Sequence, residues 1–320
     1  MTSQQIFENI SIYNEAEVDC FQNLLISYLE LYNADTNFLK ICWPWKFESS
    51  FIEKNNKYYM TLNQYESISL KRISDIYHNE GIQVYFNGED RISTLIEYIK
   101  RYQAVFVCVD EFYIPYHYNH IFKKQHGLHT LLVTNIDLQK KTVQCVSSIP
   151  FFRGSISLDL FEKAIYSLEI KEWFVYFKSH KFTNYLNSTY KEIIQKEFAL
   201  VKLSDKIIYT KDFLNYLRNV DFSDCNIDFL CKGTWGWRIA AKGNLMIDFI
   251  KKIRPFNKNH LEIIDSIEQI NLNWSKGYKL LFKNSCSMNK NFLYRAIECI
   301  ESAYKMENTL QKMVYESIDE

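Results

Sequence analysis

The chain has 320 residues, of which 47% are apolar and 24% charged. This composition supports a large buried core and argues against a disordered chain, a collagen-like repeat or a small disulfide-stapled protein. The 38 Lys and Arg residues balance the 38 Asp and Glu residues, so the net charge provides no bulk attraction to nucleic acid or to an anionic membrane.

Nothing in the sequence predicts export or a membrane span. The longest apolar run, Ala104–Val109, is far shorter than the roughly 18 residues that a spanning helix needs. The amino-terminal residues MTSQQIFE lack the positive charge and the apolar stretch of a secretion signal. The eight cysteines contain no Cys-x-x-Cys pair. We therefore expect a cytoplasmic protein with reduced thiols and with neither a membrane nor nucleic acid as its partner.

The amino-terminal third alternates helical and extended segments. Apolar residues at three- and four-residue steps predict a helix that begins at Cys20, with Asp19 in the N-cap position. Gly81 stands where a glycine would end a later helix. The expected elements are helices at Cys20–Tyr32, Ile68–His78 and Ile92–Tyr102, with short strands at Met60–Leu62 and Ile82–Phe86.

An antiparallel sheet is expected in the middle of the chain. The apolar run Ala104–Val109, which ends at Asp110, has the form of a strand buried on both faces. Thr130–Asn135 and Thr142–Ser147 are rich in β-forming residues and are joined by the polar turn Asp137–Lys141. An antiparallel hairpin is the simplest interpretation of this pair.

Helical patterns dominate from residue 157 onward, where Ser157 and the acids that follow it resemble a helix start. We therefore predict an α+β protein with a catalytic domain at residues 1–165 and a helical companion region at residues 166–320. The expected helices in the second part are at about 182–200, 210–219, 245–253, 260–276 and 289–316, with irregular chain around 221–236.

Cys20 is the candidate nucleophile, because it lies in the first turn of a predicted helix. Unpaired backbone N–H groups and the positive end of the helix dipole stabilise a thiolate there. The same N–H groups can hold the oxygen of a tetrahedral intermediate. The alternative is an unreactive cysteine that begins a core helix.

His129 is the candidate base. It opens the strand that starts the hairpin and follows Cys20 by 109 residues, an order found in papain-like folds. Its ring can thus meet the helix terminus at the end of a sheet, although it could instead close a loop by hydrogen bonds. His117, His120 and His126 lie nearby, but their spacing does not fit a metal site, and a surface loop with incidental histidines is the expected explanation.

An ordered set of segments resembles the amino-terminal domain of the butirosin-biosynthesis H protein family. That family is similar to papain-like cysteine peptidases and uses a Cys and a His. Its better understood members transfer an acyl group from a carrier-protein thioester to an amine. The resemblance implies a papain-like cysteine peptidase fold with an antiparallel sheet. The segments that carry it are Gly81–Val84, the helix to Tyr102, Val107–Asp110, Phe112–Tyr116, and His129 with its hairpin.

The resemblance also implies roles for individual residues. Cys20 would be the nucleophile and His129 the general base. Asp110, with Tyr113 and Tyr116, would lie beside the cleft, and the two tyrosines would contact substrate.

Two positions depart from the pattern of the family. Many relatives have His where this chain has Asp19, and Asp at the end of the second hairpin strand where it has Ser147 and Ser148. The third member of the site is therefore open: Ser147 or Asp110 could orient His129, or a Cys–His dyad could act without a carboxylate.

The activity that the resemblance implies is acyl transfer that forms an amide, in specialised-metabolite biosynthesis. The acyl donor would arrive on the phosphopantetheine of an acyl or peptidyl carrier protein, so the chain itself needs no cofactor and no metal. Lys123 and Lys124 are the nearest candidates for a basic carrier dock. The alternatives are a cysteine peptidase or amidase that uses water, and a non-catalytic scaffold on the same fold.

Overall fold

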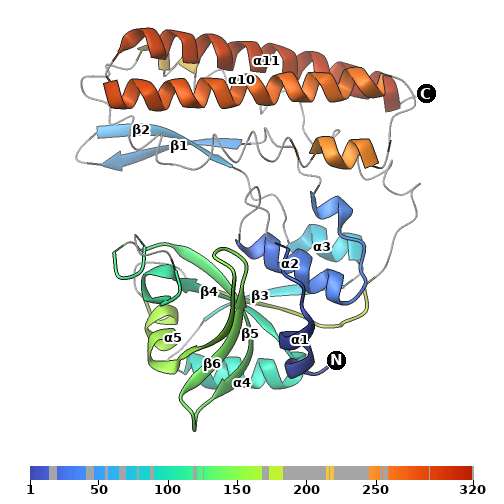
Figure 1. Ribbon diagram of the computed structural model, residues 1–320, viewed down its shortest axis with the longest axis vertical. Coiled ribbons are helices and arrows are strands. Elements are labelled where there is room, and N and C mark those ends of the chain that lie inside the picture. Colours follow the sequence, from blue (N-terminus) through green and yellow to red (C-terminus); the bar gives the residue numbers. More distant parts are fainter. Residues whose placement is uncertain are drawn as a thin grey trace. The chain divides into compact units, whose positions relative to one another are not determined.

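The computed structural model divides the chain into two compact units, drawn in Figure 1. The first comprises Met1–Leu39 and Ile68–Asn184, and the second comprises Lys40–Ser67 and Tyr185–Glu320. The structure describes residues 1–13, 20–40, 47–54, 57–64, 70–77, 79–86, 90–117, 121–124, 126–167, 173–182, 214–215, 217–219, 244, 246–252, 254, 259–287 and 289–318.

The first unit is built on a six-stranded sheet in which every neighbouring pair is antiparallel, in the order β3-β8-β4-β5-β6-β7. This sheet and its flanking helices confirm the predicted α+β class. The strands are β3 (Gly81–Tyr85), β4 (Val105–Asp110), β5 (Leu128–Asp137), β6 (Thr142–Ser147), β7 (Phe152–Ser157) and β8 (Trp173–Phe177).

The central strands agree with the sequence prediction. All six residues of β4 are buried, as a continuous apolar run predicts. Strands β5 and β6 form the predicted antiparallel hairpin. The Asp137 carboxylate stabilises its turn by accepting hydrogen bonds from the N–H groups of Gln139, at 3.0 Å, and Lys140, at 2.9 Å.

Helices cover both faces of this sheet (Figure 1). Side chains alternate along β4, so Phe106 points to one face while Val107 and Val109 point to the other. On the Phe106 face, helix α2 (Cys20–Leu31) packs Phe21 and Tyr28 edge-to-face against the Phe106 ring, at 5.6 and 5.4 Å between centroids. On the opposite face, Val107 and Val109 share a core with α4 (Arg91–Tyr102) and α5 (Leu158–Ile165).

Two smaller helices complete the first unit. Helix α1 (Ser3–Asn9) begins with a capping box between Thr2 and Gln5 and contacts β5. Helix α3 (Leu70–Tyr77) contacts β3. The prediction that Gly81 ends this helix is wrong, because Gly81 is the first residue of β3. A side chain at this position would meet the Phe177 ring at 3.0 Å, so close packing explains the glycine.

Strand β8 was not predicted. It lies in the segment where helical patterns were expected, yet it occupies the sheet between β3 and β4. The sheet therefore extends beyond residue 165, where the sequence places the boundary of the catalytic domain. Four of the five residues in the run WFVYF are buried, and a strand buried on both faces shows no alternation from which to recognise it.

The second unit contains a two-stranded hairpin and two long helices. Strands β1 (Phe47–Lys54) and β2 (Lys57–Gln64) pair antiparallel. Helices α10 (His260–Ser287) and α11 (Lys290–Ile318) pack side by side (Figure 1), and both extend beyond their predicted ends. Gly277 permits the close approach, since a Cβ there would lie 2.9 Å from Ile300 Cγ1.

The other predicted helices are described only in part. Residues 214–215, 217–219, 244 and 246–252 are helical. The predicted helix around 182–200 falls, apart from its first residue, outside the described residues, as does the irregular segment 221–236. Throughout the described ranges, none of the helices is both long enough and apolar enough to traverse a bilayer.

Candidate functional site

Cys20 is the first residue of α2, as predicted, and its side chain is only partly exposed. Its carbonyl oxygen accepts a hydrogen bond from the Ser148 hydroxyl at 3.2 Å. The amino-terminal end of α2 is thereby attached to the chain segment that follows β6. Asp19, the predicted N-cap, lies outside the described residues.

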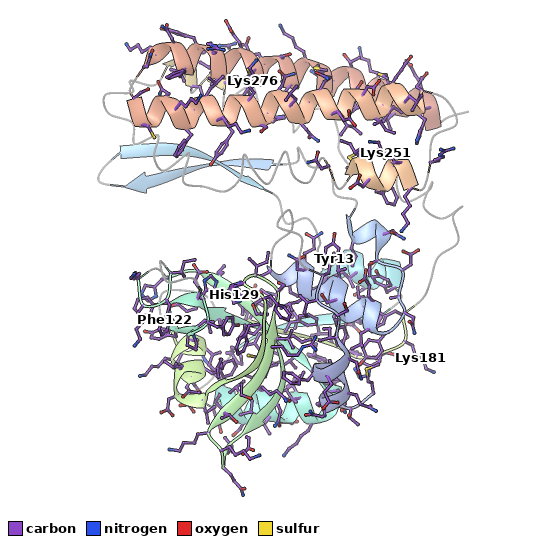
Figure 2. All side chains as sticks on the ribbon, in the orientation of Figure 1. Tyr13, Phe122, His129, Lys181, Lys251 and Lys276 are labelled. Atoms are coloured by element: carbon purple, nitrogen blue, oxygen red, sulfur yellow. The ribbon has the colours of Figure 1, made fainter. Side chains whose placement is uncertain are left out.

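His129 lies near the beginning of β5, at the end of the sheet opposite the β5–β6 turn, and is labelled in Figure 2. The residue is buried and pairs with Val109 across the β4–β5 ladder. Burial, together with the neighbouring His117 ring, lowers the pKa of His129 to about 3. The imidazole is therefore neutral at neutral pH.

Ser147 contacts the His129 ring directly. The Nε2 atom of His129 and the Oγ atom of Ser147 lie 3.0 Å apart, and both residues are buried. The adjacent Ser148 is the residue that binds the Cys20 carbonyl. Two consecutive serines at the end of β6 thus connect the imidazole with the backbone of the candidate nucleophile.

Tyr116 lies beside the same serine. Its ring stacks on Phe152 at 3.8 Å between centroids, and its hydroxyl is buried. That hydroxyl has no hydrogen-bond partner among the described residues. The pKa of the Tyr116 phenol is raised well above its ordinary range, mainly by burial and also by the thiols of Cys145 and Cys20, while the neighbouring Ser147 lowers it. Tyr116 is therefore close enough to Ser147 and to Cys20 for both to affect its phenol.

Asp110 belongs to a different network. Its Oδ1 accepts hydrogen bonds from the N–H groups of Phe112, at 3.1 Å, and Gly127, at 3.3 Å. Its Oδ2 lies 2.6 Å from both Ser167 Oγ and His126 Nδ1. Burial alone raises the pKa of Asp110, but these hydrogen bonds outweigh that effect and the pKa is lowered. The imidazole that Asp110 contacts is that of His126, three residues before the predicted base.

Tyr113 lies with the Asp110 network. It belongs to the short 3-10 helix η2 (Glu111–Tyr113) and contacts the rings of Phe112 and His126, at 4.9 and 6.3 Å between centroids. The predicted residues thus form two groups. His129, Ser147 and Tyr116 gather near the start of α2, whereas Asp110 and Tyr113 surround His126.

The prediction that the neighbouring histidines are incidental surface residues is wrong for His117. This residue is buried, its Nε2 lies 3.5 Å from Glu111 Oε2, and its ring stands perpendicular to that of His129 at 5.0 Å between centroids. His120 lies outside the described residues. Sequence reasoning noted Ser148 but not its partner, and it missed Ser167, because no periodic pattern marks a serine that binds a partner more than 50 residues away.

Lys123 and Lys124 are exposed, as expected of a surface loop. The N–H of Lys123 donates a hydrogen bond to the Phe112 carbonyl at 2.9 Å, so this basic loop is attached to η2.

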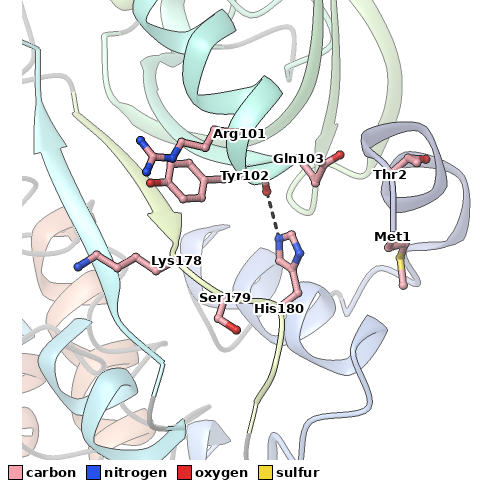
Figure 3. Close-up of a pocket in the computed structure, with 8 residues that line it drawn as sticks. All are labelled: Met1, Thr2, Arg101, Tyr102, Gln103, Lys178, Ser179 and His180. Carbon is pink, nitrogen blue, oxygen red and sulfur yellow. Dashed lines mark hydrogen bonds between the residues drawn. The ribbon is translucent and has the colours of Figure 1, made fainter.

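A cavity of about 720 Å³ opens elsewhere in the first unit (Figure 3). None of the predicted site residues lines it. His180 lines this cavity, and its Nε2 atom lies 3.1 Å from the carbonyl oxygen of Tyr102. Its lining residues are Met1, Thr2, Arg101, Tyr102, Gln103, Lys178, Ser179 and His180.

Comparison of the chain with models of known protein families and with curated proteins finds no match.

Proposed function

We propose that the protein is a cysteine-dependent acyltransferase that moves an acyl group from a carrier-protein thioester, through a thioester on Cys20, to an amine. The observation that supports this most is the end of β6, where Ser147 contacts the His129 ring and Ser148 binds the Cys20 backbone. A nucleophile at a helix start and an imidazole on an adjacent strand are the two groups that thiol acyl transfer requires.

We extend the proposal to a papain-like fold, in which a cysteine at the start of a helix precedes a histidine on an antiparallel sheet. Strand alternation puts His129 on the same face as Val109, whereas α2 packs against Phe106 on the other face. Cys20 and His129 would therefore meet around the end of β6 and not across the middle of the sheet.

In the first half-reaction, the Cys20 sulfur attacks the carbonyl carbon of the donor thioester. A new C–S bond forms, the donor C–S bond breaks, and the carrier thiol leaves with a proton. Backbone N–H groups in the first turn of α2 would hold the oxyanion. His129 is neutral, which is the protonation state that accepts a proton from the Cys20 thiol. Since such a depressed pKa makes a weak base, the helix terminus would contribute much of the thiol activation.

The proposed partners are those that the family resemblance implies. The donor would be carried on the phosphopantetheine arm of an acyl or peptidyl carrier protein, and the acceptor would be a small amine. Carrier proteins are usually acidic, and the exposed Lys123 and Lys124 would contribute to their dock. The family resemblance further implies a role in specialised-metabolite biosynthesis.

The test is an intact-mass measurement after incubation with an acyl-loaded carrier protein. The parent should gain the mass of the acyl group, and Cys20→Ala should not. Cys286→Ala is the matched control, because Cys286 is an exposed cysteine of α10, and it should load as the parent does.

Addition of an amine should discharge the acyl-protein and release an amide. Discharge in buffer alone would indicate a hydrolase, and hence a peptidase or amidase. A parent protein that never gains the acyl mass would contradict catalysis through Cys20 and favour a scaffold.

A further inference from the structure

The hydrogen bonds of Asp110 define the tautomer of His126. Asp110 is fully buried and its pKa is lowered, so it is ionised at neutral pH and can only accept hydrogen bonds. His126 Nδ1, 2.6 Å from Oδ2, must therefore carry the proton that is donated. In the neutral ring, Nε2 is then the nitrogen with the available lone pair.

The His126 ring is held at the surface of the protein. Its side chain is 38% exposed, whereas the Asp110 side chain is 0% exposed. The ring stacks on Phe112 at 4.3 Å between centroids with an interplanar angle of 4°. Gly127 donates its N–H to Asp110 at 3.3 Å, and the Glu111 carboxylate occupies the space beside its Cα, since a Cβ there would lie 2.4 Å from Glu111 Oε1. A buried carboxylate thus orients a partly exposed imidazole, the arrangement by which a general base is prepared for an external reactant.

We propose that His126, positioned by Asp110, is the catalytic base that accepts the proton of the amine during the second half-reaction. This inference rests on the proposed function, since it names a residue that acts on the acyl group held by Cys20. It separates the two proton transfers of the reaction between two histidines.

The difference in exposure between the two imidazoles supports this separation. His129 is 3% exposed, so an amine that arrives from solvent cannot contact its ring without displacing the residues around it. His126 offers its ring at the surface. One segment of chain connects the two neighbourhoods, because Phe112 stacks on His126 and Tyr116, four residues later, lies near Cys20 and Ser147.

The amine nitrogen attacks the carbonyl carbon of the Cys20 thioester, and a C–N bond forms. His126 Nε2 takes the proton from that nitrogen. The C–S bond breaks, Cys20 leaves as a thiolate, and His126 returns the proton to the sulfur or to water. Asp110 stays ionised and stabilises the imidazolium that forms between these transfers.

The experiment separates loading from discharge. The parent, His126→Asn and His126→Ala are loaded with an acyl-carrier protein, and discharge by a primary amine is followed by intact mass. Asn preserves an N–H donor near the position of Nδ1 but lacks Nε2. We expect loading rates within about 2-fold of the parent and discharge at least about 100-fold slower in both variants, within the range for general-base catalysis. Added imidazole should restore discharge by His126→Ala, which a purely structural role would not allow.

His260→Asn, a change in the second unit, is the control and should load and discharge as the parent does. The positioning role of Asp110 has its own readout: ¹⁵N NMR of His126 should show a protonated Nδ1 in the parent and a mixture of tautomers in Asp110→Asn. Normal discharge by the His126 variants, or discharge that imidazole cannot restore, would overturn the inference and leave the acyltransferase proposal standing. A parent that never loads would overturn both.

Discussion

The imidazole of His129 and the hydroxyl of Ser147 lie 3.0 Å apart on adjacent strands of the sheet, and both side chains are buried. Many members of the family that this sequence resembles have an aspartate at the end of the second hairpin strand, where this chain has Ser147 and Ser148. A hydroxyl can hydrogen-bond the ring but carries no charge that would stabilise an imidazolium. This difference accords with a His129 that stays neutral.

Replacing this serine with an acid should change the charge of His129. In Ser147→Asp, a carboxylate close to the ring should raise the pKa of His129 by about 1–3 units, the usual effect of an adjacent opposite charge. The measurement is an NMR pH titration of the His129 ring. Ser155→Asp, at an exposed position of β7, is the control and should leave the pKa unchanged. An unchanged His129 titration in Ser147→Asp would show that the two side chains do not interact.

The buried His129 predicts a stability that depends on pH. Its pKa is about 3 in the folded protein and about 6.5 in the unfolded chain, so the unfolded chain binds the proton more tightly. The contribution of His129 is complete above about pH 6.5 and is lost as the pH falls from there toward 3, with a limit of about 5 kcal/mol. Urea unfolding at several pH values measures it.

His129→Gln is the variant that isolates this contribution. The other histidines whose pKa is lowered, His180 and His260, are present in both proteins and cancel in the difference. The free energy of unfolding of the parent should fall more steeply with acid, by up to about 1.4 kcal/mol per pH unit. Parallel pH profiles for the two proteins would contradict a depressed pKa at His129.

Cys20 should react faster than the other thiols. At a helix start, a thiolate is stabilised by the dipole and by backbone N–H groups. Iodoacetamide at pH 7, followed by peptide mass mapping, should modify Cys20 before Cys286, although Cys286 is the more exposed residue. The pH midpoint of the Cys20 reaction should lie below the ordinary value of about 8.5. Faster alkylation of Cys286 would show that Cys20 is not activated.

Gly277 should be required for the close packing of α10 on α11. Alanine favours a helix by about 1 kcal/mol over glycine, but its Cβ would lie 2.9 Å from the buried Ile300. We expect Gly277→Ala to destabilise the protein by about 1–3 kcal/mol, the usual cost of overpacking. Thermal unfolding checks this. The double variant Gly277→Ala/Ile300→Ala lacks the Cγ1 atom, so its loss of stability should be smaller than the sum of the losses in the two single variants. A more stable Gly277→Ala variant would mean that the helices adjust without strain.

The sequence predicts the elements whose signal is local. The unbroken apolar run of β4, the polar turn between β5 and β6 and the periodicity of α4 each identify their own structure, and each is confirmed. Strand β8 could not be predicted from its own residues, because its five residues resemble any short buried segment. Pairing with β3 and β4 is what makes it a strand.

In the candidate site, too, features with a local sequence signal were predicted and those that depend on distant contacts were not. The positions of Cys20 at a helix start and His129 on a strand follow from local patterns, and both are confirmed. The partner of Asp110 could not be predicted, since His126 and His129 lie three residues apart and only side-chain direction distinguishes them. His129 follows the alternation of β5 into the core, whereas His126 precedes the strand and turns back to the carboxylate.

The hairpin of β1 and β2 has a further consequence, because Lys40–Ser67 belongs to the second unit while the chain on both sides belongs to the first. During synthesis these residues leave the ribosome long before the carboxy-terminal helices that complete their unit. The first unit would consequently fold while Lys40–Ser67, inserted within it, still lacks the rest of the second unit. A nascent chain that stops short of α10 would hold this hairpin without the rest of the unit to which it belongs.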